Sequence, residues 1–299
     1  MNTALLVEVE TYMKSYALQS IGLAAAAAVL LSGCGGKTDG ASASGTPAPS
    51  SPPSVSASPA PSAAAPSPSL SPSPSPLPPA TPQKAEAMFK MSSKTFRFSP
   101  VDSETSNKAV LLTFDDGPKE KEELTSMLDT LDKHGAKAIF FVNGYRVKQN
   151  PELLKLIDER GQTIGNHSWD HIDLHKKSKA EVQKQLGDVS DLVEELTGKR
   201  PLFFRPPFGT GGDVGKEVAK EDGMLYMTWS NGSLDWDLKA TKKDPQLVIK
   251  NVLEQLHPGA NILMHELPWT KEALDSLLTK LEEKGYGFID PASIDLKQG

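Results

Sequence analysis

Residues 109–118 read AVLLTFDDGP, an apolar run that stops at two adjacent aspartates, Asp115 and Asp116. A short apolar run bounded by turn residues is typical of a strand in a sheet. Neighbouring carboxylates repel each other and need a cation or a proton between them. Asp-Gly-Pro is also good turn chemistry, so a plain surface turn remains the alternative. The stretch therefore predicts a strand whose carboxyl end carries either a charged site or a simple turn.

Strand-like runs of this kind alternate with amphipathic helical segments along the rest of the chain. The helical segment around Val182 has apolar residues spaced four and three apart, and glycines such as Gly198 follow the last turns as helix stops. Repeated strand-then-helix units predict a parallel sheet, and about seven of them favour a barrel, with chemistry at the carboxyl ends of the strands. The other predicted strands are KAIFFV from Lys137, QTIGN from Gln162, LFFR from Leu202, MLYMTW from Met224, NILMH from Asn261 and YGFID from Tyr286.

Two histidines follow the third predicted strand, in the segment NHSWDH. His167 and His171 have the spacing of metal ligands, and with Asp116 they make a set that leaves coordination positions open for water and substrate. The segment is not the HExxH pattern of zinc proteases, because Ser168 stands in place of the glutamate. A histidine pair in a loop is by itself more often solvated or capping. The histidine pair indicates a catalytic metal site only when it is taken together with the polar residues at the ends of the other predicted strands.

Further polar residues follow the later predicted strands. Arg205 opens the segment RPPFG after the fourth strand, where it would hold a carboxylate in a bidentate geometry or remain a solvated charge. Asp235 lies in the segment GSLDW beyond the fifth strand, and His265 ends the sixth. Charged and titratable residues at the ends of successive strands are hard to attribute to chance. We interpret them as one active site.

These segments, in this order, resemble the signature of the polysaccharide deacetylase family, also called carbohydrate esterase family 4 or the NodB homology domain. TFDDGP, HSxxH, RPPFG and LxH all match, and the resemblance covers Lys108 to Pro291. One position departs from the family pattern, since the motif often written DxxDW has Gly232 at its first position. This departure weakens any role for a carboxylate there. The resemblance implies an α/β fold, a distorted (β/α) barrel of about seven parallel strands.

The resemblance also implies a catalytic role for each matched polar residue. Asp115 would be the general base, and Arg205 would orient it. His265 would be the general acid that protonates the leaving amine, and Asp235 would tune its pKa. No covalent intermediate between enzyme and substrate is needed in such a reaction.

The remaining matched positions would hold the metal and the substrate. The backbone N–H of Phe208 would help to form the oxyanion hole, and Trp236 and Leu263 would line the acetyl pocket. The cofactor would be a divalent metal, with Zn²⁺ expected and Co²⁺ or another divalent ion as alternatives. The ligands implied for it are Asp116, His167 and His171.

The amino-terminal segment has the plan of a signal peptide. From Met13 it reads MKSYALQSIGLAAAAAVLLSGC, with a lysine, an apolar run and small residues before Cys34. The apolar run is shorter than the roughly 20 residues that span a bilayer, so a transmembrane helix is the weaker alternative. LSGC resembles the lipobox of bacterial lipoproteins, although an ordinary buried cysteine is the other interpretation. Residues 1–34 are therefore predicted to be a lipoprotein signal peptide, starting at Met1 or Met13, with Cys34 lipidated.

The segment after this cysteine has the composition of a linker. Residues 35–84 are dominated by Pro, Ser, Ala and Gly and have too few large apolar residues to form a core. Extended at up to ~3.1 Å per residue, they would hold a domain on the order of 100 Å from the membrane. Residues 85–299 remain as one deacetylase domain, large enough to fold without disulfides or oligomerisation, and we expect a monomer. Residues 85–107 would be a short preceding strand or a flexible approach.

Composition and location narrow the function further. The formal net charge of −6 gives no basic face of the kind found in nucleic-acid-binding proteins, and the single cysteine excludes a disulfide within the chain. An extracytoplasmic domain anchored to the bacterial cell membrane through lipid fits hydrolytic removal of N-acetyl groups from peptidoglycan N-acetylglucosamine. Chitin oligomers, an exopolysaccharide and O-acetylated substrates are alternatives. A catalytically inactive carbohydrate-binding lipoprotein is the alternative from another class.

Overall fold

The strand predicted from AVLLTFDDGP is the centre of the structure. The computed structural model describes residues 86–297. In it β3, Ala109–Gly117, pairs in parallel with β4, Ala138–Val142, on one side and with β9, Ala260–His265, on the other. The predicted signal peptide with Cys34 and the linker of residues 35–84 lie outside the described residues.

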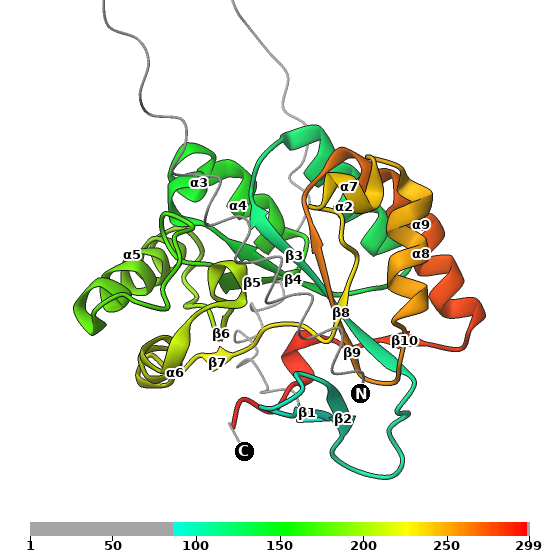
Figure 1. Cartoon of the computed structure of the whole chain (residues 1–299), viewed down its shortest axis with the longest axis horizontal. Coiled ribbons are helices and arrows are strands. Elements are labelled where there is room, and N and C mark those ends of the chain that lie inside the picture. Colours follow the sequence, from blue (N-terminus) through cyan, green and yellow to red (C-terminus); the bar gives the residue numbers. More distant parts are fainter. Residues whose placement is uncertain (1–85, 298–299) are drawn as a thin grey trace, which may run out of the picture. The chain divides into compact units, whose positions relative to one another are not determined.

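Each predicted strand is present, and all of them pair in parallel (Figure 1). The sheet runs in the order β7-β6-β5-β4-β3-β9-β8, and β10 pairs with the first residues of β3. The prediction of a distorted (β/α) barrel is confirmed. The remaining strands are β5, Thr163–Asn166; β6, Phe203–Phe204; β7, Leu225–Tyr226; β8, Asn231–Gly232; and β10, Gly287–Phe288.

The fifth predicted strand differs from the structure in one respect. Of the run MLYMTW only Leu225–Tyr226 forms β7, and a separate short strand, β8, follows and pairs with β9 at the other end of the sheet. Asp235 therefore comes after β8 rather than directly after the fifth predicted strand. The segment Asn231–Gly232 has no apolar run, so periodicity gives no signal for this strand.

The sheet curls until its distant strands share an interior. Arg205, which follows β6, donates from Nη2 to Asn261 Oδ1 on β9 at 3.1 Å and to the carbonyl oxygen of Thr228 beyond β7 at 2.8 Å. Because β5, β4 and β3 separate β6 from β9 in the sheet, this side chain crosses the inside of the curl. No hydrogen-bonded pairing between β7 and β8 closes the barrel within residues 86–297. The result is an open, distorted barrel.

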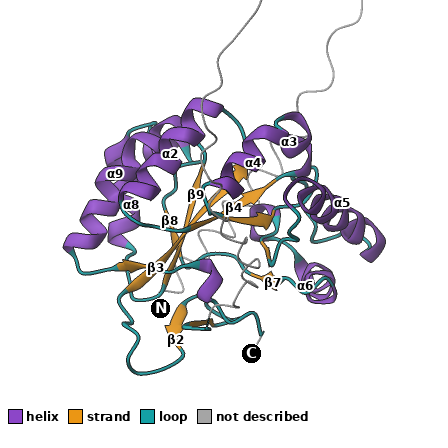
Figure 2. Ribbon diagram, turned by 180° about the vertical axis from the view of Figure 1, so that it is seen from behind, coloured by secondary structure: helices purple, strands orange, loops and turns teal. Residues whose placement is uncertain are grey.

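Helices surround the strands and bury the outer face of the sheet (Figure 2). Outward-facing strand residues such as Leu112 and Phe140 are buried with helical residues such as Leu128 and Leu277, a contact that stabilises the fold by roughly 25 cal/mol per Å² of apolar surface. The helices are α2, Lys121–Lys133; α3, Gly144–Gln149; α4, Pro151–Glu159; α5, Lys179–Thr197; α6, Gly212–Glu221; α7, Leu238–Thr241; α8, Pro245–Glu254; and α9, Pro268–Glu283, with 3₁₀ turns η1, Pro207–Gly209, and η2, Pro291–Ser293.

Helix α5 follows its sequence signals at both ends. Ser178 accepts the backbone N–H of Glu181, whose side chain accepts the N–H of Ser178 in return, which is a capping box. Gly198 ends the helix with a φ of 73°, a left-handed conformation that favours glycine. The helix stop predicted at this position is confirmed.

The amino end of the barrel is closed by apolar residues. Strands β1, Phe89–Met91, and β2, Phe98–Pro100, form an antiparallel pair below the sheet in Figure 1. Phe89 and Phe98 are buried with Leu111 and Ile139 of the central strands. Residues 85–107 therefore contain short strands rather than only a flexible approach. None of the helices in the described part of the chain combines the length and apolarity needed to cross a membrane.

Candidate active site

The predicted metal ligands meet at the carboxyl end of the barrel. Asp116 Oδ1 lies 3.1 Å from His171 Nε2 and 3.5 Å from His167 Nε2. One ligand atom from each of these residues lies within 4.8 Å of the other two. The structure thus brings together Asp116, His167 and His171, the three residues predicted to bind a metal.

Local backbone geometry turns these side chains toward one point. Successive residues of a strand point to opposite faces, which would direct Asp115 and Asp116 apart. Asp116 has a φ of 67°, and the pairing of β3 with β4 shifts register between Asp115 and Gly117. His171 and Ser168 also have positive φ values, of 53° and 64°. Such conformations cost energy for residues other than glycine and cluster at functional sites.

The second nitrogen of His167 is already engaged. His167 Nδ1 lies 2.7 Å from the carbonyl oxygen of Arg205, and a carbonyl only accepts hydrogen bonds. Nδ1 therefore carries the proton, and Nε2 keeps a lone pair that points to the metal-ligand set. Asn143 Nδ2 donates to the carbonyl oxygen of His167 at 2.8 Å and fixes the backbone at this position.

The three side chains fit a divalent cation. Asp116 Oδ1 is buried and has no conventional hydrogen-bond partner within the described residues. Burial alone would raise the pKa of Asp116, but the close His167 and His171 side chains and the charge of His265 hold this pKa well below its usual range. An ionised carboxylate with two neutral imidazoles is a donor set typical of catalytic zinc, with room for water or substrate.

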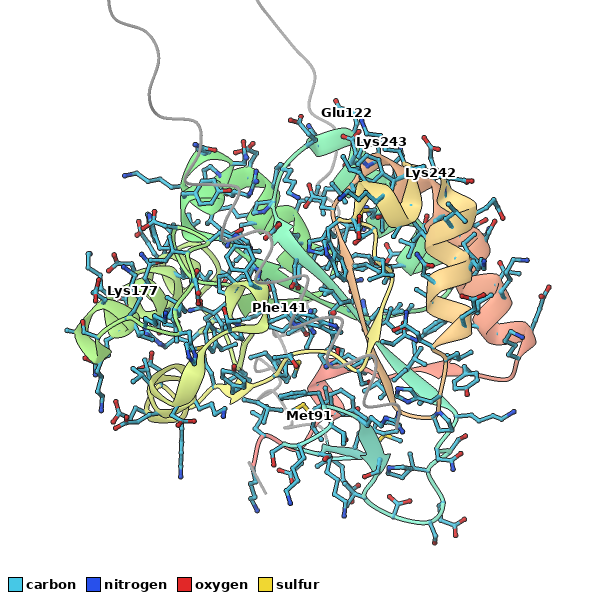
Figure 3. The ribbon with its side chains drawn as sticks, viewed as in Figure 1. Met91, Glu122, Phe141, Lys177, Lys242 and Lys243 are labelled. Atoms are coloured by element: carbon cyan, nitrogen blue, oxygen red, sulfur yellow. The ribbon has the colours of Figure 1, made fainter. Side chains whose placement is uncertain are left out.

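Arg205 lies at the centre of the polar interior and is fully buried. Its Nη1 donates to Asp115 Oδ1 and to Thr113 Oγ1, both at 2.8 Å. The guanidinium also lies 4.4 Å from the ring centre of Phe141, which Figure 3 labels in the middle of the sheet. Burial lowers the pKa of Arg205, while the adjacent Asp115 carboxylate raises it. Removing one partner of a buried ion pair strongly destabilises the fold, because the other charge is left buried and unpaired.

The two oxygens of Asp115 have different surroundings. Oδ1 is occupied by Arg205, whereas Oδ2 lies 3.7 Å from His167 Nε2, on the side of the metal-ligand set. Asp115 itself is 3% exposed. The carboxylate is thus held by one oxygen and presents the other toward the metal-ligand set.

His265 is paired with a fully buried aspartate. Asp235 Oδ1 lies 2.8 Å from His265 Nδ1, and Asp235 Oδ2 accepts the backbone N–H of His265 at 2.6 Å and the hydroxyl of Thr270 at 2.7 Å. Burial lowers the pKa of His265, but the charge and the hydrogen bond of Asp235 outweigh it, and the pKa is raised. A raised pKa keeps this imidazole protonated to a higher pH, as a general acid requires.

The apolar residues of the prediction border the same site. The ring of Trp236 lies edge-on to His265, with 5.2 Å between ring centres, and Leu263 is buried on β9 two residues before His265. Phe208 has a φ of 59° in η1, and its ring lies edge-on to His171 at 4.7 Å. The N–H of Phe208 donates to no group in residues 86–297, which leaves it available to a ligand.

Sequence reasoning missed several residues that support the site. Thr113 and Asn261 both contact the Arg205 guanidinium, and Thr270 supports Asp235 from α9. Thr113 lies two residues before Asp115, and Asn261 lies four before His265. The period of two along a strand would have placed both on the interior face. Nothing in the pattern of α9 marks Thr270.

Known proteins resemble this chain in sequence and structure. The family described as polysaccharide deacetylase matches residues 102–227. Peptidoglycan-N-acetylglucosamine deacetylase PgdA of Listeria monocytogenes is 39% identical over 223 residues, which are 71% of this chain and 46% of that protein. Peptidoglycan-N-acetylmuramic acid deacetylase PdaA of Bacillus subtilis is 36% identical over 186 residues, which are 62% of this chain and 70% of that protein. The chain belongs to the polysaccharide deacetylase family.

Solved structures of this family include both enzymes and inactive relatives. A CE4 family pseudoenzyme from Bacillus anthracis superposes with a TM-score of 0.59 at 32% identity, covering 62% of this chain and 66% of that one. The polysaccharide deacetylase fold alone therefore does not establish activity. The present chain also spans less than half of the Listeria protein.

Proposed function

We propose that this protein is a metal-dependent hydrolase that removes N-acetyl groups from cell-wall polysaccharide, with peptidoglycan N-acetylglucosamine as the substrate. The observation that carries this proposal is that Asp115 and His265, in register on the paired strands β3 and β9, lie at the same strand ends as the metal-ligand set. Both are held by buried partners, Arg205 and Asp235 respectively. Relatives with the same family domain are named peptidoglycan deacetylases, which supports the choice of substrate.

The chemistry divides among the residues of the site. A divalent cation held by Asp116, His167 and His171 would polarise the acetyl carbonyl and lower the pKa of a water from about 15.7 toward roughly 7. Asp115 accepts the proton of the attacking water on Oδ2, because Oδ1 is held by Arg205. The N–H of Phe208 donates to the oxygen that gains negative charge.

His265 completes the reaction. An amine is a poor leaving group unless it is protonated, and the imidazolium of His265 supplies that proton. Asp235 keeps the imidazole in one orientation, with Nδ1 toward the carboxylate and Nε2 free for the substrate nitrogen. The products are acetate and a glycan with a free amino group.

Zn²⁺ is the metal we propose for this site. Two histidines and one carboxylate are a usual ligand set for catalytic zinc, and Co²⁺ accepts the same donors. The closeness of the three donor atoms, all within 4.8 Å, supports binding of a single ion.

A catalytically inactive carbohydrate-binding protein is the second candidate. The pseudoenzyme from Bacillus anthracis supports this candidate, because it shows that the family includes a member described as inactive. Against it stands the complete set in this chain, since Asp115, Asp116, His167, His171 and His265 are all present and in contact with their supporting residues.

We also propose that the domain works outside the cytoplasm, attached to the bacterial cell membrane through lipid on Cys34. The support comes from the sequence, in which an apolar run and LSGC precede a long Pro- and Ser-rich segment. Two acyl chains give stable anchoring where one would be marginal. A deacetylase held in this way would reach the cell wall along the linker.

Acetate release tests the proposed activity. The full chain is loaded with Zn²⁺ and assayed on purified peptidoglycan, chitin oligomers and acetylated xylan. The same assays are repeated after a chelator has removed the metal. We expect metal-dependent acetate release that is fastest on peptidoglycan and that is slowed about a hundredfold or more in the Asp115→Asn variant. Acetate from xylan alone would reassign the enzyme to O-acetylated substrates. Binding of these glycans without any acetate release would favour the inactive carbohydrate-binding protein.

A further inference from the structure

Glu266 is a buried carboxylate to which the proposed reaction gives no part. It follows His265 directly at the carboxyl end of β9 and is 3% exposed. Its Oε1 accepts the backbone N–H of Lys119 at 2.7 Å and the backbone N–H of Glu120 at 3.0 Å. Burying a carboxylate is costly unless it is hydrogen-bonded, and these two bonds compensate part of that cost. Glu266 therefore fastens the segment of Lys119 and Glu120 to the end of β9.

The segment that Glu266 holds joins the metal-ligand candidate Asp116 to helix α2. Glu120 is the amino-terminal cap residue of α2, and its own side chain makes no capping hydrogen bond. The first N–H groups of a helix have no partners within the helix, and a carboxylate beside them is favourable. Glu266 supplies this carboxylate from β9. The start of α2 is thus held by a distant strand rather than by a local cap.

The close approach of Glu266 explains why residue 117 is a glycine. The φ of Gly117 is not positive, so its backbone conformation is open to other residues. A Cβ placed on Gly117 would lie only 2.7 Å from Glu266 Oε2, and apart from its chain neighbours it would meet no atom outside the Glu266 carboxylate within 4 Å. Because Oε1 of that carboxylate is held by two N–H groups, the carboxylate has little freedom to move aside. Glu266 therefore packs directly against the residue that follows Asp116.

The other side of the same turn is held by β4. The backbone N–H of Asn143, which follows β4, donates to the carbonyl oxygen of Gly117 at 3.1 Å. Asp116 has a φ of 67° in this turn, a costly conformation that persists only when the surrounding structure holds it. Strand β3 lies between β4 and β9 in the sheet. The turn is thus held from both neighbouring strands, and Glu266 provides the contacts on the β9 side.

We propose that Glu266 is a positioning residue that holds Asp116 in its metal-binding conformation. The proposal rests on the proposed function, because it takes Asp116 as a ligand of the catalytic metal. Glu266 acts through the backbone from Gly117 to Glu120 and touches neither the metal nor the substrate. Groups that orient metal ligands in this way typically contribute about ten- to a hundredfold to metal affinity. Because Glu266 follows His265, one strand end both carries the proposed acid and fixes the turn of the metal ligand.

Metal binding by variants of the full chain tests this role. The dissociation constant for Zn²⁺ is measured by competition with a chromophoric chelator, for Glu266→Ala, Glu266→Gln, Gly117→Ala and the double variant Gly117→Ala/Glu266→Ala. Circular dichroism and urea unfolding of each metal-free protein show whether the domain is folded. Acetate release is measured at increasing Zn²⁺. Asp244→Ala is the matched control, because Asp244 Oδ1 caps α8 by accepting the N–H of Gln246 at 2.8 Å, and α8 follows no metal-ligand candidate.

Glu266→Ala should weaken Zn²⁺ binding by about ten- to a hundredfold, and excess Zn²⁺ should restore its activity. Glu266→Gln should keep most of the affinity, because its amide oxygen accepts the same two N–H groups. Gly117→Ala should weaken Zn²⁺ binding when Glu266 is present and add no further loss to Glu266→Ala, because the added methyl group meets only the Glu266 carboxylate. Asp244→Ala should lower stability and leave Zn²⁺ affinity unchanged.

Unchanged Zn²⁺ affinity in a folded Glu266→Ala variant would refute the proposal. Equal losses in Glu266→Ala and Glu266→Gln would also refute it, because the charge of Glu266 would then matter and not its hydrogen bonds. If Glu266→Ala does not fold, Gly117→Ala decides, since full Zn²⁺ affinity in that variant would show that displacing the carboxylate has no effect. Zn²⁺ binding that depends on Glu266, without acetate release from any glycan, would refute the proposed function and leave the positioning role standing.

Discussion

Asp115 and His265 lie opposite each other, in register on the paired strands β3 and β9. Residues in register on adjacent strands project to the same face, so the proposed base and acid enter the barrel interior side by side. Arg205 fixes the first from β6, and Asp235 fixes the second from beyond β8. The separation between the groups that take and give protons is therefore set by strand pairing, the most rigid feature of the fold.

Replacing Asp235 should change the pH dependence of the reaction. Asp235→Asn keeps the shape of the side chain but removes the charge that raises the pKa of His265. Because His265 must be protonated to act as the acid, rate falls as pH rises above its pKa. The alkaline limb of kcat/KM should therefore move to lower pH, with bound metal unchanged.

Asp237→Asn is the matched control for this change. Asp237 lies in the same loop and caps α7, a position that asparagine also fills well. Its profile should match that of the unmodified protein. An alkaline limb that stays in place in Asp235→Asn would remove Asp235 from the acid step.

Breaking the buried pair of Arg205 should destabilise the domain. Arg205→Leu leaves Asp115 buried without its partner, which costs about 3–5 kcal/mol. Arg200 is the control, because its contacts with Asp191 and Glu194 are exposed. Arg200→Leu should cost about 0–1 kcal/mol. Urea unfolding measures the free energy of unfolding of both variants. Equal losses of this free energy would show that Arg205 contributes no more to stability than a surface cation does.

The sequence predicted the strands and the residues at their ends, because both depend on local signals. Apolar runs such as AVLLTF and KAIFFV mark strands that are buried, and a parallel barrel places all their carboxyl ends together. The metal ligands and the acid could then be assigned by motif. The order of the strands, and the lack of pairing between β7 and β8 in the described residues, depend on contacts between distant parts of the sequence. No local sequence pattern predicts such contacts.

The contacts that support the site were harder to predict. Thr270 reaches Asp235 from α9, and Asn261 reaches Arg205 across the barrel. Each of these residues is unremarkable in its own segment, and its role exists only once the sheet has curled.

Lipid attachment at Cys34 predicts a change of location. Cys34→Ser removes the thiol that would be acylated, so the protein should leave the membrane fraction or remain unprocessed. Fractionation and intact mass measure this directly. A variant that stays in the membrane at the same mature mass would contradict the lipoprotein interpretation.

The two adjacent aspartates should separate metal binding from proton transfer. Asp116→Asn removes the charged ligand, so metal affinity should fall strongly and excess metal should restore part of the activity. Asp115→Asn keeps the ligand set but loses the proton acceptor, at a cost of about a hundredfold or more in rate that added metal does not restore. Bound metal and acetate release are measured for both variants. Loss of metal in Asp115→Asn with retention in Asp116→Asn would reverse the assignment.

Gly232 should widen the acyl pocket. It pairs in register with Leu263, and a Cβ placed on it would lie 3.5 Å from Trp236, an ordinary contact distance. Both neighbours are the residues assigned to the acetyl pocket, and Gln255 holds the Gly232 backbone through its N–H and carbonyl groups. Gly232→Ala should therefore fit without strain and fill space that a longer acyl group would use.

The measurement is selectivity between N-acetyl and N-propionyl chitin oligomers. Gly232→Ala should lower kcat/KM for the propionyl substrate by about tenfold or more, the usual effect of one methylene in a tight pocket, and change the acetyl rate little. Gly187→Ala is the control, because a Cβ added to this helical glycine in α5 meets no atom within 4 Å. If Gly232→Ala slows both substrates equally, its side chain blocks the site as a whole, and Gly232 does not set the length of the acyl group.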